Sequence, residues 1–167
     1  MTALSLAELQ RLANETWREV WCTRIGNKIE LHQVKPSGQM IGMLFEEILK
    51  HKLHAQDPKA WPLERKKGDK DLHYAPDPRL SIEIKTSGQK GYEVFGNRSY
   101  ALSDVKDNKA AYFLVINYTG PQLRRVRFGY LTQQHWLAQK SSSGQQCKLN
   151  LLGKAALVDL LSEAKNN

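Results

Sequence analysis

The chain has 167 residues, 41% of them hydrophobic, which suits one domain with a buried core and is too much for a disordered chain. The longest apolar run, residues 110–116, is too short to cross a bilayer, and Cys22 and Cys147 alone make no disulfide framework. Lys and Arg number 25 against 17 Asp and Glu, a net charge of +8, which favours a polyanionic partner, although many basic proteins bind no nucleic acid. We expect a single, unprocessed domain over residues 1–167, cytoplasmic and without membrane contact.

The N-terminal part is expected to form two helices. Apolar residues recur at helical spacing between residues 6 and 21, which predicts an amphipathic first helix. Gly26 then marks a turn, and Ser37 is a suitable N-cap for a second helix over residues 38–54. The buried face of that helix is expected to hold Met40, Ile41, Leu44, Phe45, Ile48 and Leu49. The polar residues 56–70 predict a surface connection.

Two strands are expected next, over residues 71–74 and 80–86. Pro76 and Pro78 lie between them, and because proline cannot donate to a sheet, both belong to a turn. The two strands therefore predict an antiparallel hairpin.

The second half of the chain predicts further strands and one helix. Residues 88–108 form a loop-rich segment with a short helix near Leu102, and residues 110–118 form a strand buried on both faces. Residues 123–132 alternate apolar and polar side chains, as a strand does. A weak strand and a last helix over residues 154–164 follow. The element order predicts an α/β fold with a mixed central sheet flanked by helices.

The candidate chemistry lies on the second strand of the hairpin. Glu83 and Lys85 are two residues apart, so their side chains share one face with Cα atoms about 6.6 Å apart. A carboxylate beside an ammonium suits metal-dependent hydrolysis of a phosphodiester. Taken alone, an ordinary ion pair on an exposed strand is the better explanation.

Asp71 strengthens the metal-dependent interpretation. If the hairpin is symmetric about Asp77, facing residues have numbers that sum to 154, and Asp71 lies opposite Glu83 with Cβ atoms about 4.5–5.5 Å apart. Two carboxylates at that distance repel each other unless a divalent cation lies between them. The same register predicts an ion pair between Asp69 and Lys85, and leaves Asp77 at the tip of the turn, outside the site.

Two segments resemble the core signature of the PD-(D/E)XK nuclease superfamily: residues 68–72, Gly-Asp-Lys-Asp-Leu, and residues 82–87, Ile-Glu-Ile-Lys-Thr-Ser. The resemblance implies a restriction-endonuclease-like fold, in which a further acidic residue comes from the preceding helix. Glu46 is the expected counterpart, and Glu47 is its rival.

Residues 86–101 carry a more specific resemblance. Their Thr-Ser-Gly and Phe-Gly-Asn-Arg-Ser-Tyr motifs are similar to those of ScaI-like type II restriction endonucleases. The resemblance implies a Mg²⁺-dependent, sequence-specific endonuclease, a hydrolase that cuts double-stranded DNA to 5′-phosphate and 3′-hydroxyl ends. It implies that Asp71, Glu83 and the Ile84 carbonyl bind one or two Mg²⁺ ions, and that Lys85 positions or deprotonates a water.

The DNA contacts are expected in the loop after the second hairpin strand, from Gln89, Lys90, Asn97 and Arg98, whose side chains suit base edges or phosphates. Arg125 and Arg127 either add phosphate contacts or are solvated. A palindromic target implies a homodimer, to which Trp17 and Trp21 of the first helix are candidate contributors. Two alternatives remain: a repair or recombination nuclease of the same fold, and a DNA-binding module without catalysis.

Overall fold

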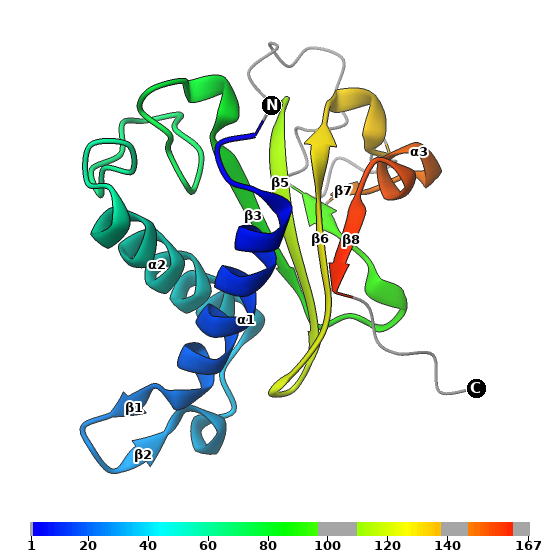
Figure 1. Ribbon diagram of the computed structural model, residues 1–167. Coiled ribbons are helices and arrows are strands. Elements are labelled where there is room, and N and C mark those ends of the chain that lie inside the picture. The colour runs from blue at the N-terminus through cyan, green and yellow to red at the C-terminus, as the bar shows by residue number, and fades with distance from the viewer. Residues whose placement is uncertain (1, 97–109, 138–146, 162–167) are drawn as a thin grey trace.

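A four-stranded mixed sheet forms the centre of the protein (Figure 1). The structure is a computed structural model that describes residues 2–96, 110–137 and 147–161. The strand order is β3-β5-β6-β8; β3 pairs with β5 in parallel, and the other two pairs are antiparallel. The strands are β3 (Ile82–Ser87), β5 (Ala111–Thr119), β6 (Gln122–Leu131) and β8 (Val158–Leu161). The expected α/β fold with a mixed central sheet flanked by helices is confirmed.

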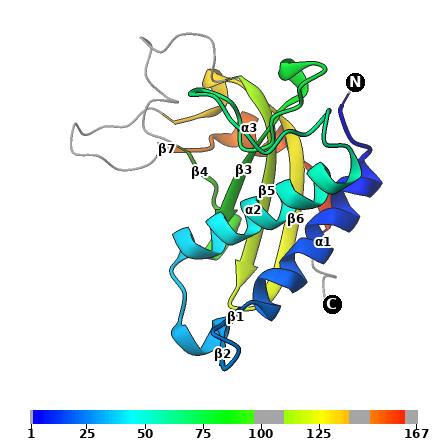
Figure 2. The ribbon, with the colours of Figure 1, turned by 90° about the vertical axis from the view of Figure 1, so that its left-hand side faces the viewer.

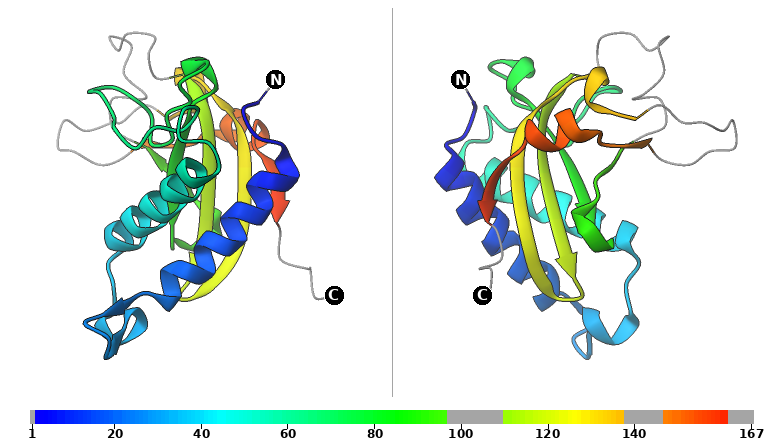
Figure 3. Two further views of the ribbon diagram at one scale, coloured as in Figure 1. Left: turned by 60° about the vertical axis from the view of Figure 1, so that its left-hand side comes forward. Right: turned by 90° about the vertical axis from the view of Figure 1, so that its right-hand side faces the viewer.

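Two long helices cover one face of this sheet (Figures 2 and 3). They are α1 (Leu6–Cys22) and α2 (Gly38–Gln56). Ser5 caps α1, and Ser37 caps α2 by accepting a hydrogen bond from the Met40 N–H at 3.2 Å, as the sequence predicts. Met40 itself is 39% exposed, contrary to its predicted place on the buried face. The turn predicted at Gly26 joins the two-residue strands β1 (Arg24–Ile25) and β2 (Ile29–Glu30), which the 3₁₀ helix η1 (Leu31–Val34) follows.

Strand β5 separates two hydrophobic cores, because its side chains alternate between the faces of the sheet. Leu114, Ile116 and Tyr118 join the core under α1 and α2, whereas Phe113 and Val115 join a smaller core on the opposite face. Shorter elements cover that second face: β4 (Phe95–Gly96), η5 (Gln133–His135), β7 (Cys147–Lys148) and α3 (Leu151–Ala155) (Figure 3). The prediction that this strand is buried on both faces is confirmed.

The predicted hairpin has the expected register but not two full strands. Leu72 and Ile82, whose numbers sum to 154, form an isolated antiparallel bridge. Their N–H groups donate to each other's carbonyl oxygens at 2.9 and 3.0 Å. Residues 71–74 do not continue as a strand, and a 3₁₀ helix, η2 (Pro78–Leu80), replaces the start of the second one. The cause is local, since the Asp77 carboxylate accepts from the Arg79 N–H and caps η2.

The predicted last helix is wrong. Residues 158–161 form the strand β8 at the edge of the sheet, with Val158 opposite Phe128 and Asp159 opposite Arg127. Hydrogen bonds to β6 outweigh the helical spacing of the sequence there. Gly129 allows this approach, because a Cβ atom at that position would overlap the Ala156 carbonyl oxygen. Residues 162–164 and the predicted short helix near Leu102 lie outside the described residues.

Three further expectations are tested by burial. Trp61, in the predicted surface connection, is 6% exposed, and its ring lies tilted against that of Tyr74, so that connection contributes to the core. Trp17 is 3% exposed against α2 and β5, which removes it as a dimer contact. Cys22 and Cys147 are both free thiols.

Among the helices of the described residues, none has the length and apolarity needed to cross a membrane.

Candidate active site

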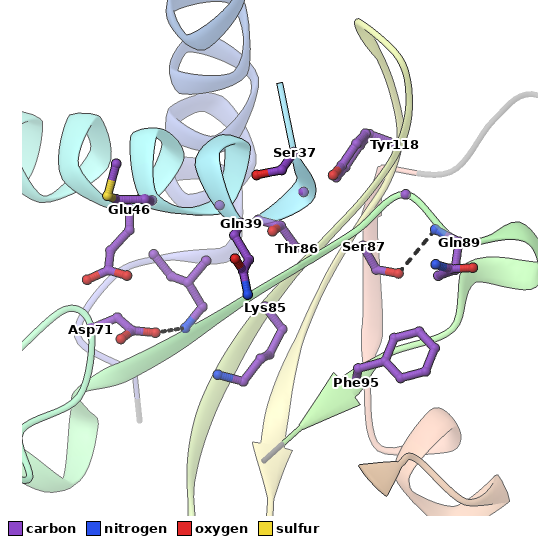
Figure 4. A pocket seen from close by; sticks show the side chains of 15 residues that line it. Ser37, Gln39, Glu46, Asp71, Lys85, Thr86, Ser87, Gln89, Phe95 and Tyr118 are labelled. Atoms are coloured by element: carbon purple, nitrogen blue, oxygen red, sulfur yellow. Dashed lines mark hydrogen bonds between the residues drawn. The ribbon is translucent and has the colours of Figure 1, made fainter. Parts of the chain in front are cut away.

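A groove of about 590 Å³ runs between α2 and the open edge of β3 (Figure 4). Strand β3 pairs with β5 on one side, so its other edge faces α2 and the loops around it. The lining comes from α2, β3 and the segments that follow β3: Ser37, Gly38, Gln39, Gly42, Met43, Glu46, Asp71, Ile84, Lys85, Thr86, Ser87, Gly88, Gln89, Phe95 and Tyr118. Four of the expected site residues, Glu46, Asp71, Ile84 and Lys85, are thereby brought together with Gln89.

Asp71 is fixed against the open edge of β3. Its Oδ2 accepts a hydrogen bond from the Ile84 N–H at 2.8 Å, drawn in Figure 4. Backbone groups of one strand residue point to the same side of the strand, so the Ile84 carbonyl oxygen faces this edge as well. The bridge between Leu72 and Ile82 holds Asp71 at this position. The carboxylate and the carbonyl expected as metal ligands therefore lie next to each other.

The side chains of Glu83 and Lys85 project from β3 close enough to Asp71 to affect its charge. The Lys85 Nζ donates to Glu83 Oε1 at 2.7 Å, and the two side chains are 19% and 13% exposed, in that order. Burial raises the pKa of Asp71, and the Glu83 charge raises that pKa further. Glu83 itself is not among the residues that line the groove. The pairing predicted between Asp69 and Lys85 is wrong, because Asp69 accepts from the Lys66 N–H at 2.7 Å and lies 3.8 Å from His73.

The structure separates Glu46 from Glu47. Gly42 packs against Thr86, where a Cβ atom would come within 2.8 Å of the Thr86 hydroxyl oxygen. This close approach of α2 to β3 places Glu46, one helical turn later, on the groove. Glu47 points elsewhere, to Lys50. Of the two candidates, Glu46 lines the groove and Glu47 does not, and the role of Glu46 in the site stays a prediction.

Arg65 lies beside the candidate site, although it belongs to residues 56–70, for which a surface connection was predicted. Its Nη1 lies 2.7 Å from Glu46 Oε1 and 3.4 Å from Asp71 Oδ1. It therefore neutralises two carboxylates that would otherwise repel each other. The basic run of residues 65–67, directly before the Gly-Asp-Lys-Asp motif, was the available signal. Glu46, Asp71 and Lys85 line the groove, and Arg65 and Glu83 are their ion-pair partners. We call these five residues the charged end of the groove.

The donor set at the charged end fits Mg²⁺, which prefers carboxylate and carbonyl oxygens. Burial and the Asp71 charge raise the pKa of Glu46, so carboxylates crowd one another here. Within the described ranges, no three side chains of metal-binding type are close enough together to hold an ion. The Arg65 guanidinium lies between Glu46 and Asp71. The carboxylates and the carbonyl are thus of the type that a divalent cation prefers, while the partner of Glu46 and Asp71 in this structure is Arg65.

The expected DNA contacts are divided by the structure. Gln89 lies at the far end of the groove, where its N–H donates to the Ser87 hydroxyl at 3.3 Å (Figure 4). Lys90 begins the exposed 3₁₀ helix η3 (Lys90–Tyr92), outside the lining. Asn97 and Arg98 lie outside the described residues.

Arg125 and Arg127 of β6, the two arginines expected to contact phosphate or to be solvated, both have partners within the protein. Arg127 is 4% exposed and donates to the Tyr92 carbonyl and the Asn117 side-chain oxygen, each at 2.7 Å. Burial lowers its pKa to about 10. It is therefore neither solvated nor placed to contact phosphate. Arg125 pairs with Asp159 across β6 and β8.

The architecture, a mixed sheet with a groove at its edge strand, is compatible with a restriction-endonuclease-like fold. The chain belongs to the ScaI restriction endonuclease family, whose family model matches residues 2–158. It is 33% identical over 146 residues to a protein described as type II restriction enzyme ScaI, from Streptomyces caespitosus. That similarity covers 80% of this chain and 63% of the relative, so the chain spans less than two thirds of the relative's length. The expected likeness to ScaI-type enzymes is confirmed.

Proposed function

We propose that this chain is a Mg²⁺-dependent, sequence-specific endonuclease of double-stranded DNA, a type II restriction enzyme of the PD-(D/E)XK superfamily. The observation that carries the proposal is the convergence of Asp71, Glu83, Lys85 and the Ile84 backbone at one open strand edge. The relative described as a type II restriction enzyme supports the same activity. The proposal treats residues 1–167 as one cytoplasmic domain.

The charged end has groups for each part of phosphodiester hydrolysis. Asp71, Glu83, the Ile84 carbonyl and Glu46 would hold one or two Mg²⁺ ions, which supply polarisation of the phosphate and acidification of a bound water. The Lys85 ammonium, oriented by Glu83 at 2.7 Å, orients the attacking water and offsets negative charge on the phosphate. The water oxygen bonds to phosphorus, the bond to the 3′ oxygen breaks, and that oxygen takes a proton. The products are a 5′-phosphate and a 3′-hydroxyl.

DNA recognition is assigned to the segment after β3. Gln89 at the end of the groove and Lys90 on η3 are the described members of this set, and Asn97 and Arg98 complete it. Side chains of these types bind base edges and phosphates. A palindromic target would require a twofold homodimer, and we include such a dimer in the proposal.

The test is cleavage of a long unmethylated phage DNA with Mg²⁺ or with EDTA, by wild type and by Lys85→Ala. Discrete fragments that need Mg²⁺ and disappear in the variant are the expected result. No cleavage with any divalent metal, while the DNA is still retarded on a gel, would contradict catalysis and favour a binding module. Cleavage that depends on branched DNA rather than on sequence would favour a repair or recombination nuclease.

A further inference from the structure

Among the described residues, the second end of the groove has no acidic side chain. It is formed by Ser37, Gly38, Gln39, Gly88 and Tyr118, which we call the polar end. We propose that the polar end is a subsite for one backbone phosphate of the DNA, separate from the phosphate that is cut. This inference rests on the proposed function, because it assigns a second contact for the same substrate.

The Tyr118 hydroxyl is the first observation. Tyr118 is 8% exposed, and its ring packs against Trp17 with centroids 4.9 Å apart. The structure gives its hydroxyl no hydrogen-bond partner among the described residues, although the ring lines the groove. In Figure 4 the hydroxyl points toward Ser37 at the start of α2. The Tyr118 oxygen is not among the buried unpaired side-chain atoms of the described residues, so it opens onto the groove and can donate to a ligand there.

The second observation is the start of α2 itself. The first amides of a helix have no partner within the helix, and the helix dipole favours a negative charge beside them. Ser37 uses its side-chain oxygen to accept from the Met40 N–H, which leaves the N–H groups of Gly38 and Gln39 toward solvent. Burial raises the pKa of Tyr118, so its hydroxyl remains a donor. The polar end thus presents several donors and, as far as the described lining goes, no acidic side chain.

Two glycines leave room for an anion between these donors. A Cβ atom on Gly38 would lie 3.3 Å from the Tyr118 oxygen, and one on Gly88 would lie 3.0 Å from the Tyr118 ring. Any larger side chain at these positions would crowd the hydroxyl. Small residues at this point let a phosphate approach the backbone, as glycines do in other phosphate sites.

The spacing along α2 relates the subsite to the charged end. Gly38, Gly42 and Glu46 follow one another at intervals of four residues, and all three line the groove. Residues so spaced share one helix face, and eight residues of helix span about 12 Å. The phosphate at the polar end is therefore more than one nucleotide away from the phosphate at the charged end. The contact contributes affinity and register, whereas bond breaking stays at the other end.

The test compares three variants in their binding to a short DNA duplex with Ca²⁺ in place of Mg²⁺. Tyr118→Phe removes the hydroxyl and keeps the ring, and Gly38→Ala keeps the hydroxyl but crowds it. Tyr130→Phe is the matched control, because Tyr130 is 46% exposed on β6 and does not line the groove. The duplex carries a mapped cleavage site, or a random sequence if nothing is cleaved.

Tyr118→Phe and Gly38→Ala should each weaken DNA binding, the former by roughly tenfold, as expected for a lost hydrogen bond to a charged group. Tyr130→Phe should bind like wild type. A neutral methylphosphonate at a single position should weaken the wild-type complex and cause no additional loss in Tyr118→Phe. Unchanged thermal unfolding of both variants shows that the fold is intact.

The outcomes separate this inference from the proposed function. If DNA is cleaved but Tyr118→Phe binds like wild type, the subsite is overturned and the endonuclease stands. If nothing is cleaved but Tyr118→Phe binds the random duplex more weakly than Tyr130→Phe does, the subsite stands and the endonuclease fails. A methylphosphonate effect that is the same in wild type and Tyr118→Phe at every position also overturns the subsite.

Discussion

The two ends of the groove differ in charge: one has paired carboxylates and cations, and the other has neutral hydrogen-bond donors. At the charged end, Glu46 and Asp71 are paired with Arg65, and Glu83 is paired with Lys85. The polar end has neutral donors, and the Tyr118 hydroxyl is without a partner in the described part of the chain. Under the proposed function, a cation at the charged end would replace Arg65 as the partner of Glu46 and Asp71, whereas the donors proposed for an anion at the polar end include an unpaired hydroxyl. On the two proposals, the charged end determines the rate of DNA cleavage, and the polar end contributes to the affinity for DNA.

The largest expected effect is at Glu83. Glu83→Gln removes the negative charge of a proposed ligand and of the Lys85 partner, whose Nζ donates to Glu83 Oε1 at 2.7 Å. We expect cleavage to slow by roughly 10²–10³-fold, the loss typical of removing one group that stabilises the transition state. Single-turnover cleavage measures the rate, and fluorescence anisotropy measures DNA binding. Cleavage near the wild-type rate would contradict the proposed catalytic role of Glu83. A loss of DNA affinity as large as the loss of rate would contradict separate roles for the two ends.

Glu46 and its neighbour offer an internally controlled comparison. Glu46→Gln should slow cleavage by about 10–100-fold, the range for groups that support a metal site. Glu47→Gln should have little effect, because Glu47 pairs with Lys50 away from the groove. The same cleavage assay, run over a range of Mg²⁺ concentrations, distinguishes them. An equal effect of both substitutions would show that α2 does not face β3 in this register.

Asp71→Asn tests the electrostatic cost of the charged end. Burial and Glu83 raise the pKa of Asp71 in the folded protein, so the unfolded chain loses this proton at lower pH. The ionised carboxylate consequently destabilises the fold, and wild-type stability falls as the pH rises from the unfolded pKa of about 4. Without metal, Asp71→Asn should unfold at a higher temperature than wild type at pH 7. The difference should shrink toward pH 4, and calorimetry across pH measures it.

The smallest expected effect is at Arg65. Arg65→Met removes the guanidinium from between Glu46 and Asp71, so a cation no longer has to displace it. We expect Mg²⁺ affinity to rise by about two- to fivefold, which corresponds to a partly exposed ion pair. Isothermal titration in the absence of DNA measures the change, and Lys66→Met is the control. Weaker Mg²⁺ binding in Arg65→Met would mean that Arg65 supports the ligands rather than competing for them.

The sequence predicted those parts of the fold that depend on residues close to one another in the chain. The alternation in β3 and the proline-containing turn led to the pairing of Leu72 with Ile82, because both signals act over a few residues. The edge strand β8 was not predictable in this way. Its conformation depends on β6, about 30 residues earlier, and on the space that Gly129 leaves. Residues 158–161 have a spacing that also fits a helix, and tertiary pairing decides between the two.

The site shows the same division. Asp71, Glu83 and Lys85 lie within a short hairpin, so their proximity follows from register alone. Arg65 and Tyr118 reach the groove from a loop and from the second strand of the sheet. No spacing in the sequence relates either of them to β3. The basic run of residues 65–67 was a signal for Arg65, but its two carboxylate partners, and the place of Tyr118 on the groove, become visible only in three dimensions.

The hydrogen bond from the Ile84 N–H to Asp71 also protects the sheet from self-association. Within the part of the chain that the structure describes, the outer edge of β3 has a single backbone bridge, at Ile82. An unpaired strand edge is a template on which another chain can add. The Asp71 carboxylate occupies one donor of that edge at 2.8 Å and places negative charge where an incoming strand would dock. Asp71, which is proposed to take part in hydrolysis, would thus also disfavour the addition of another strand to this edge.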